Sequence, residues 1–137
     1  MGFLSDFANG IRGGKIRGNA VLLMRQIIGE HAIPNEVSAY LSDYTSNYPL
    51  SSSDVPEVAI MGLIRYHDLG TKGEGKGLLL QKIVNWLAFA EGQSSRVIPD
   101  FCREMVLDRI TEHNEWCLGE GLSLKDNLCK YLEKYEG

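Results

Sequence analysis

The sequence predicts an all-α fold, a bundle of five or six helices around two central apolar helices. Three observations lead to this prediction. Apolar residues recur at helical spacing along most of the chain, and no segment alternates polar and apolar residues as a half-exposed strand does. The two most apolar runs, 55–68 and 78–91, are bracketed by glycine or proline and exceed ~10 residues, which favours helices over strands. The 137 residues are enough to bury a core and predict one domain over 1–137.

The N-terminal residues 1–18 are predicted to form an apolar and basic, glycine-rich arm. Its second half carries four glycines: Gly10, Gly13, Gly14 and Gly18. Because glycine at this density opposes a helix interior, we expect at most one helical turn followed by a flexible link. The first regular helix is expected to run from Asn19, a candidate N-cap, to His31, and Pro34 then enforces a break.

Prolines and capping residues delimit the second and third helices. The second helix is predicted over 35–47, and Pro49 terminates it. The third helix is predicted to begin at Asp54, which resembles the start of a capping box because Glu57 follows three residues later. Pro56 is tolerated in the first turn of a helix, so it does not contradict this start.

The third and fourth helices are joined by a glycine-rich loop, 70–77. The fourth helix, 78–91, is apolar nearly all round, a pattern typical of a helix buried in a core or at a subunit interface. Large apolar patches seldom stay exposed on soluble monomers and twofold dimers are the commonest closed assembly, so we expect a homodimer. A long helix over about 99–118 begins with a proline in its first turn, and a last amphipathic helix begins near Ser123.

Composition and charge exclude several classes of protein. The formal net charge is −4 and neither half of the chain is strongly basic, so nucleic-acid binding has no electrostatic support. Three separated cysteines do not predict a secreted disulfide framework. The sequence has neither a recognisable signal peptide nor the ~18 uninterrupted apolar residues that span a bilayer. We therefore expect a soluble cytoplasmic protein without a membrane or nucleic-acid partner.

The loop 70–77 nearly matches a phosphate-binding loop of the form G-x-x-x-x-G-K followed by Ser or Thr. The matching residues are Gly70, Gly75 and Lys76. Gly77 stands where the magnesium-binding hydroxyl belongs, and a helix precedes the loop where the motif needs a strand. The preferred interpretation is a flexible connection between helices. Anion contact through Lys72 and Lys76 is the alternative, and nucleotide hydrolysis is the least favoured.

His113 and Cys117 are four residues apart and share one face of a helix, and zinc prefers such ligands. Cys102 lies about four turns from Cys117 along the same helix, so one helix supplies only a pair of ligands. We interpret His113 as a core histidine with one hydrogen-bonded nitrogen, and we predict neither a metal nor a cofactor.

Acidic residues at four-residue spacing form a ridge on the long helix: Asp100, Glu104, Asp108 and Glu112. A carboxylate-bridged metal centre needs such residues to face the interior of a bundle. The apolar Met105 and Ile110 face elsewhere, so we expect the ridge to be solvated, with docking to a basic partner as the alternative.

Aromatic residues supply two candidate surfaces. Tyr40, Tyr44 and Tyr48 form a ladder down one helix, either as an interface or as the edge of the core. A candidate apolar pocket between helices has four lining residues: Trp86, Phe89, Met105 and Trp116.

No catalytic Ser/His/Asp, Cys/His or paired-carboxylate set is recoverable from the sequence, so we lean against an enzyme. The first functional hypothesis is a small non-enzymatic protein that acts through protein–protein contacts, with a regulatory role as one form of it. The second is a small-molecule-binding helical domain that uses the apolar pocket. The third is phosphate or nucleotide binding through the loop 70–77.

Overall fold

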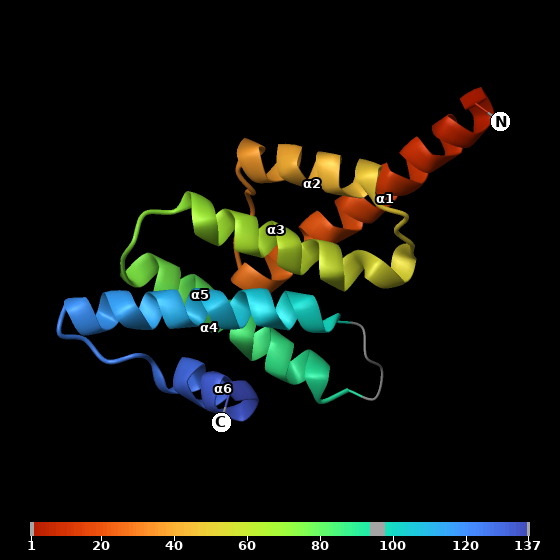
Figure 1. Ribbon diagram of the computed structural model, residues 1–137. Helices are drawn as coiled ribbons and strands as arrows, with labels where there is room; N and C mark the ends of the chain where they lie inside the picture. The colour runs from red at the N-terminus through yellow and green to blue at the C-terminus, as the bar shows by residue number, and fades with distance from the viewer. Residues whose placement is uncertain (1, 94–97, 137) are drawn as a thin grey trace. The chain divides into compact units, whose positions relative to one another are not determined.

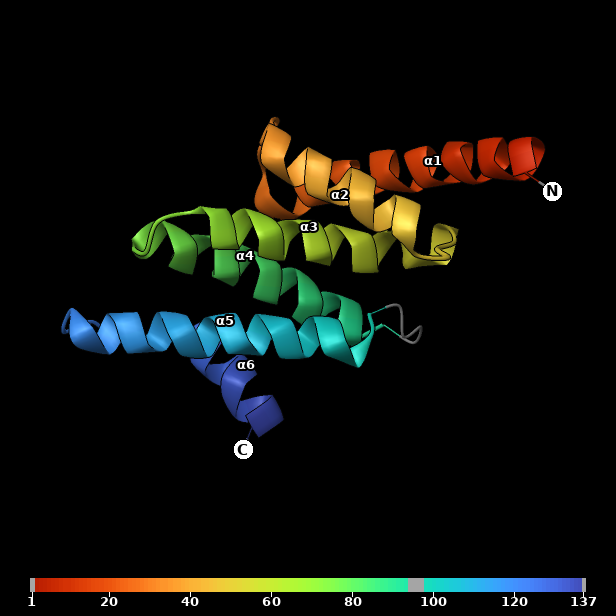
Figure 2. The same cartoon turned by 45° about the horizontal axis from the view of Figure 1, so that its top comes forward.

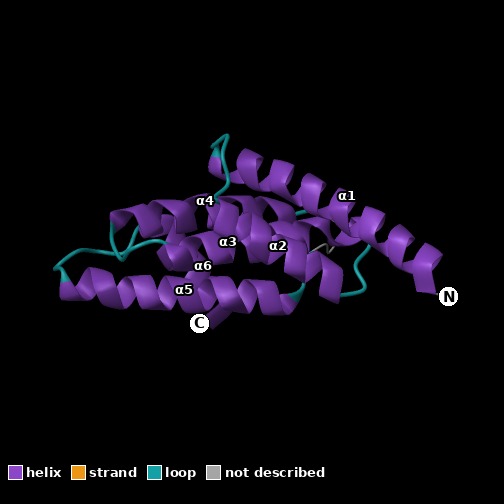
Figure 3. Cartoon of the chain, turned by 90° about the horizontal axis from the view of Figure 1, so that it is seen from above, coloured by secondary structure: helices purple, strands orange, loops and turns teal. Residues whose placement is uncertain are grey.

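The computed structural model of the protein describes residues 2–93 and 98–136, and it describes side chains over 13–93 and 98–135. Within these ranges the chain forms six α-helices, one short 3-10 helix and no strand, which confirms the predicted all-α bundle (Figures 1 and 3). The helices are α1 (Gly2–Ile28), α2 (Asn35–Asn47), α3 (Val55–Leu69), α4 (Glu74–Glu91), α5 (Asp100–Gly119) and α6 (Asp126–Glu136), and the 3-10 helix η1 (Ser52–Asp54) precedes α3. Among the described residues, no helix combines the length and the apolar character needed to cross a membrane.

The contacts within the chain group into two compact units, and each is described by itself. The N-terminal unit, Met1–Tyr66, contains α1, α2 and most of α3. The C-terminal unit, His67–Gly137, contains the end of α3 together with α4, α5 and α6. The presence of one domain over 1–137 stays a prediction.

The N-terminal helix α1 corrects the prediction of a flexible arm over 1–18. The helix is continuous from Gly2 to Ile28, and Asn19 lies inside it instead of capping it. Four side chains at four-residue spacing are buried: Ile16, Ala20, Met24 and Ile28. Because this apolar stripe begins upstream of Asn19, packing outweighs the ~1 kcal/mol that a glycine costs in a helix.

Glycine also lets α1 approach α2 closely. A Cβ on Gly13 would lie 3.2 Å from the carbonyl oxygen of Thr45. Arg17 Nη1 donates a hydrogen bond to Ser42 Oγ at 2.9 Å beside this contact. Gly29 then ends α1 with a positive φ of 71°, and its N–H donates to the carbonyl oxygen of Arg25 at 2.8 Å. Gly13 is thus part of the helix packing that the flexible-arm prediction left out.

The start of α3 also differs from the prediction. The Asp54 carboxylate accepts a hydrogen bond from the backbone N–H of Ser51 at 2.8 Å, so Asp54 closes the 3-10 turn before α3. Glu57, predicted to complete a capping box with Asp54, instead accepts a hydrogen bond from the Tyr44 hydroxyl at 2.9 Å. Glu57 therefore binds Tyr44 of α2 and does not form the cap that its local spacing predicted.

The loop predicted over 70–77 is shorter in the structure, because α4 begins at Glu74. Only residues 70–73 connect α3 to α4. Gly73 is the N-cap of α4 and has φ 153° and ψ −173°, a backbone conformation that residues with a side chain rarely adopt. Gly77 is buried within the first turns of α4, so this glycine permits close packing and does not contribute to a flexible loop.

The helices α4, α5 and α6 pack against one another in the C-terminal unit (Figures 1 and 2). The buried residues of α4 include Leu80, Ile83, Val84, Leu87 and Ala90. Two polar residues of α4, Gln81 and Asn85, face α6, where Asn127 Nδ2 donates to Asn85 Oδ1 at 3.0 Å and lies 3.4 Å from the carbonyl oxygen of Gln81. The same side of α4 also carries apolar residues that are open to solvent, since Leu78 is 55% exposed and Phe89 67% exposed. The helix α4 thus carries more apolar surface than its own unit buries.

Candidate functional site

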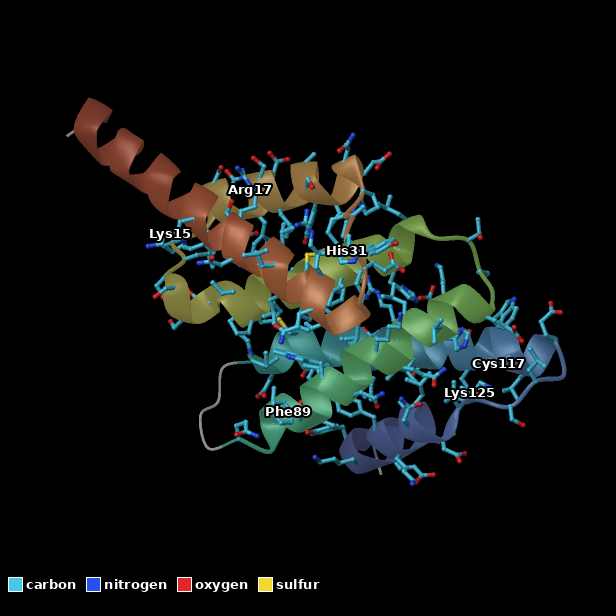
Figure 4. All side chains as sticks on the ribbon, turned by 180° about the vertical axis from the view of Figure 1, so that it is seen from behind. Lys15, Arg17, His31, Phe89, Cys117 and Lys125 are labelled. Carbon is cyan, nitrogen blue, oxygen red and sulfur yellow. The ribbon has the colours of Figure 1, made fainter. Side chains whose placement is uncertain are left out.

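An open cleft of about 530 Å³ lies in the C-terminal unit between α4, α5 and the segment that follows α5. Its lining residues are Glu74, Gly75, Gly77, Leu78, Gln81, His113, Trp116, Cys117, Leu122, Ser123 and Lys125. Figure 4 shows two of them, Cys117 and Lys125, near each other where the chain passes from α5 towards α6. Clefts that hold small molecules typically measure about 300–1,000 Å³, so this one has the volume of a ligand site.

Two glycines of α4 create the space on its side of the cleft. A Cβ on Gly77 would lie 2.5 Å from His113 Nε2, so the backbone of α4 rests directly against the imidazole ring. A Cβ on Gly75 would have no neighbour within 4 Å, because Gly75 borders open space. A side chain at either position would fill the cleft or displace His113.

The α5 wall of the cleft is a packed row of three side chains. The rings of His113 and Trp116 are stacked, with centroids 5.5 Å apart and planes 21° apart. His113 Nε2 lies 3.5 Å from Cys117 Sγ, and both residues are buried. Burial lowers the pKa of His113, with smaller contributions from His67 and Lys76, so the ring is neutral at pH 7. These surroundings fit a core histidine with one hydrogen-bonded nitrogen.

A second, smaller hollow adjoins the cleft. It measures about 30 Å³ and is lined by His67, Lys72, Gly73, Lys76, Glu112, His113 and Trp116. His113 and Trp116 line both spaces, so the hollow and the cleft share a wall. Lys72 and Lys76, the two residues predicted from the sequence to contact an anion, both lie here.

His67, at the end of α3, is the polar centre of this hollow. Its ring is 3% exposed, and Nδ1 lies 3.0 Å from Asp68 Oδ1. Arg109 binds the same carboxylate through Nε at 3.2 Å and Nη2 at 2.8 Å. In the described part of the chain, His67 Nε2 is the only buried side-chain nitrogen or oxygen without a hydrogen-bond partner.

Burial is the main cause that lowers the pKa of His67. The hydrogen bond from Nδ1 to Asp68 opposes the shift, and the charges of Lys76 and Arg109 add to it. Burial works in the opposite direction on Asp68, but hydrogen bonds from Arg109 and His67 keep the pKa of its carboxyl below the usual value. The neutral His67 ring therefore donates from Nδ1 to an ionised Asp68, and Nε2 carries a lone pair.

His67 is the residue of this site that sequence reasoning did not select. The signal lies in the sequence as a histidine and an aspartate, His67 and Asp68, directly before a loop with two lysines. The periodicity of α3 does not reveal the partners of this pair, because Arg109, which binds Asp68, comes from α5 and lies 41 residues further along the chain.

Only one of the four residues predicted to line an apolar pocket lies in the cleft, and that residue is Trp116. Phe89 is 67% exposed, and Trp86 and Met105 are half-buried outside the cleft lining. The cleft lies at the N-terminal end of α4, whereas Trp86 and Phe89 lie more than one turn further along this helix. The apolar pocket of these four residues therefore stays a prediction, and this cleft brings in Trp116 alone.

The three predicted interface tyrosines form a continuous row in the N-terminal unit. The ring centroids are 6.2 Å apart for Tyr40 and Tyr44 and 4.8 Å apart for Tyr44 and Tyr48. Tyr44 donates to Glu57, and the Arg65 guanidinium lies 5.9 Å from the centre of the Tyr40 ring. Tyr48 is 57% exposed, so the row changes from internal contacts to an open surface along α2.

The four acidic residues of the predicted ridge, Asp100, Glu104, Asp108 and Glu112, are all exposed on α5. Arg103 donates to Asp100 at 2.9 Å. Among the described residues, no cluster of three or more His, Cys, Asp or Glu side chains has an arrangement that would hold a metal ion.

Comparison with known proteins does not supply a functional assignment: no protein family, no curated protein and no solved structure matches the chain significantly. The functional conclusion therefore depends on the cleft and the hollow.

Proposed function

We propose that the protein is a non-enzymatic helical protein that binds a small molecule in the cleft between α4 and α5. The observation that carries this proposal is the cleft itself, with its volume of about 530 Å³. Leu78, Trp116 and Leu122 offer apolar and aromatic surface to a ligand, while Gln81 and Ser123 offer hydrogen bonds. An apolar wall with a few polar groups is typical of small-molecule sites.

Binding is favoured over catalysis because of the state of Cys117, the one nucleophile beside a histidine in this cleft. Cys117 is 3% exposed, and reactive cysteines typically lie in electropositive and partly exposed surroundings. His113, its neighbour, is held between α4 and Trp116. Such a buried pair supports packing more than nucleophilic attack.

The test of this function is NMR with neutral aromatic probes, indole and 1-naphthol. We expect saturable shifts in backbone signals of α4 and α5 around the cleft. The Gly75→Leu variant should abolish these shifts, because the new side chain would enter the cleft. Gly18→Leu is the matched control, since Gly18 is also an exposed helical glycine without neighbours within 4 Å of a Cβ. Absence of shifts with both probes, and also with 1-naphthyl phosphate and 1-naphthoate, would contradict the proposal.

The second candidate function is action through protein contacts, with a second copy of the chain as the first partner to test. Large apolar side chains that are more than half exposed favour it: Leu22, Tyr48, Leu78, Phe89 and Leu118. Exposed apolar surface on this scale is typical of interaction sites when the residues are contiguous. Sedimentation velocity over a range of concentrations separates this candidate from a monomer.

A cytoplasmic location belongs to the same proposal. Cys117 and Cys129 are free thiols, and free thiols persist in reducing compartments. The net charge of −4 gives no support to a nucleic-acid partner. Fractionation of cells that express the protein with a C-terminal tag tests the location, and recovery from the culture medium would contradict it.

A further inference from the structure

We infer that the ligand of the cleft is an organic anion, whose phosphate or carboxylate group enters the hollow formed by His67, Lys72 and Lys76 while its apolar body lies against Trp116. This inference rests on the proposed function of the cleft and specifies its ligand class. The shared lining of the two spaces is the first argument. His113 and Trp116 line both the cleft and the hollow, so a group held in the hollow lies beside the aromatic ring that an apolar body would contact.

Charge is the second argument. Two lysines, Lys72 and Lys76, and one glutamate, Glu112, line the hollow, which leaves one excess positive charge. Arg109 and Asp68 bind each other beside it and neutralise each other. Glu74 and Lys125 line the neighbouring cleft and carry opposite charges, so the hollow, with its one excess positive charge, is the more favourable place for a negative group.

The N-terminus of α4 adds backbone donors at the same place. Gly73 lines the hollow and is the N-cap of this 18-residue helix, and a glycine has no side chain that could cap the first N–H groups. The first N–H groups of a helix have no partners within the helix, and the helix dipole favours negative charge there. A phosphate or carboxylate at this point would accept hydrogen bonds from backbone and lysine together.

The unpartnered nitrogen of His67 independently points to a ligand. His67 is only 3% exposed, and its Nδ1 contacts Asp68. Its Nε2 has no hydrogen-bond partner among the described residues. Leaving a buried polar atom unpaired costs about 1–3 kcal/mol of desolvation in proteins. A protonated ring would donate from Nε2 to an anion oxygen, and a neutral ring would accept from the P–OH of a monoprotonated phosphate.

The size of the hollow limits what enters it. A volume of about 30 Å³ accepts a water-sized group, such as one or two oxygens of a tetrahedral or carboxylate anion. The remainder of the ligand must therefore lie outside the hollow, where Trp116 offers it an aromatic surface. A single water molecule is the competing occupant, and it would not distinguish charged from neutral compounds.

The experiment compares three probes with the same ring: 1-naphthol, 1-naphthyl phosphate and 1-naphthoate. Binding is followed by tryptophan fluorescence in the Trp86→Phe variant, in which Trp116 is the remaining tryptophan. We expect at least one of the two anions to bind about tenfold or more tightly than 1-naphthol, since hydrogen bonds to charged groups are among the stronger ones. Comparison of the two anions then identifies phosphate or carboxylate as the preferred group.

Lysine variants locate the effect. Lys76→Met and Lys72→Met keep the apolar stem and remove the charge, so each should reduce the preference for the anion towards the affinity of 1-naphthol. Lys130→Met is the matched control, because Lys130 is exposed on α6 and lines neither space. Unchanged melting temperatures show that the variants fold.

Two outcomes distinguish failure of the inference from failure of the proposed function. If 1-naphthol and both anions bind with equal affinity, the inference is overturned while the cleft retains its proposed function. If none of the three binds, the proposed function fails and the inference fails with it. A preference for anions that survives both lysine substitutions also overturns the assignment to the hollow.

Discussion

The two ends of α4 carry polar clusters of opposite character. At the C-terminal end, the Glu91 carboxylate accepts hydrogen bonds from the hydroxyls of Tyr131, at 2.7 Å, and Tyr135. At the N-terminal end, the buried His67 ring has Asp68 on one nitrogen and no partner in the described chain on the other. The fold itself satisfies the Glu91 cluster, whereas the His67 cluster leaves one buried nitrogen without a partner among the described residues.

This difference separates a polar cluster that the fold satisfies from the proposed binding site. Burial is the main cause of the pKa shift at both ends: it raises the pKa of Tyr131 and lowers that of His67. Both groups are therefore neutral near pH 7. What distinguishes them is the number of hydrogen bonds that remain to be made, together with Lys72 and Lys76 beside His67.

The largest expected effect on stability comes from adding a side chain at the N-terminal end of α4, beside the His67 cluster. Gly77→Ala places a Cβ 2.5 Å from His113 Nε2, so the buried ring or the helix must move. We expect the free energy of unfolding to fall by about 1–3 kcal/mol, as overpacking typically causes. Chemical denaturation measures it.

Gly75→Ala is the control for that substitution, because its Cβ has no neighbour within 4 Å. We expect an increase of up to about 1 kcal/mol, since alanine is the better helix former. Equal stability of the two variants would show that α4 does not rest against His113 as described.

The Glu91 cluster at the C-terminal end of α4 is tested by Tyr131→Phe, which removes one hydroxyl donor to Glu91. We expect a loss of about 1 kcal/mol, the usual net value of a hydrogen bond. The raised pKa of Tyr131 also predicts a pH effect: above about pH 10 the unfolded tyrosine ionises first, so stability falls as pH rises. Denaturation curves from neutral to alkaline pH should fall less steeply for Tyr131→Phe, and parallel curves would argue against the Glu91 cluster.

At the N-terminal end of α4, the His67 cluster should have a smaller effect on stability, and this effect appears at acid pH. The lowered pKa of His67 means that, below about pH 6.5, the unfolded state takes up a proton before the folded state does. This contribution to stability is complete above that pH and is lost as pH falls towards the folded pKa. His113 adds a shift of the same sign. His67→Gln should retain only the part due to His113, and an unchanged acid limb in denaturation would contradict the burial of His67.

The smallest effect on stability is expected at the exposed side of α4. Phe89 is 67% exposed, so Phe89→Ser should change the free energy of unfolding by no more than about 0.5 kcal/mol. If this side contacts a second copy, the same substitution should weaken self-association in sedimentation velocity. Gln93→Ser, at an exposed position just past α4, is the control. Equal association of both variants and the original chain would remove Phe89 from any dimer contact.

The sequence predicted the helices more fully than the sites, and the reasons are physical. The second helix coincides with its prediction because prolines bracket it and fix both ends. The first helix was predicted too short because the glycine content of 1–18 argues locally against a helix, while the buried stripe of α1 argues for it through packing.

The site was predicted in part for a similar reason. Lys72 and Lys76 were found because they sit in a near match to a phosphate-binding loop, which is a local pattern. His67 joins them only when α3, α4 and α5 come together in the C-terminal unit, and Phe89 proves exposed only once the rotation of α4 is known. Sequence spacing gives the faces of a helix but not which neighbour covers each face.

The most direct test of the N-terminal end of α4 is a titration with inorganic phosphate, followed by NMR of the His67 imidazole nitrogens and the N–H signals of Gly73 and Gly75. The site described here predicts saturable shifts at these groups and a rise in the pKa of His67, because a bound anion stabilises the protonated ring. Chloride at matched ionic strength should not reproduce them. Phosphate and chloride titrations that leave His67 equally unaffected would contradict an anion site at this end of the helix.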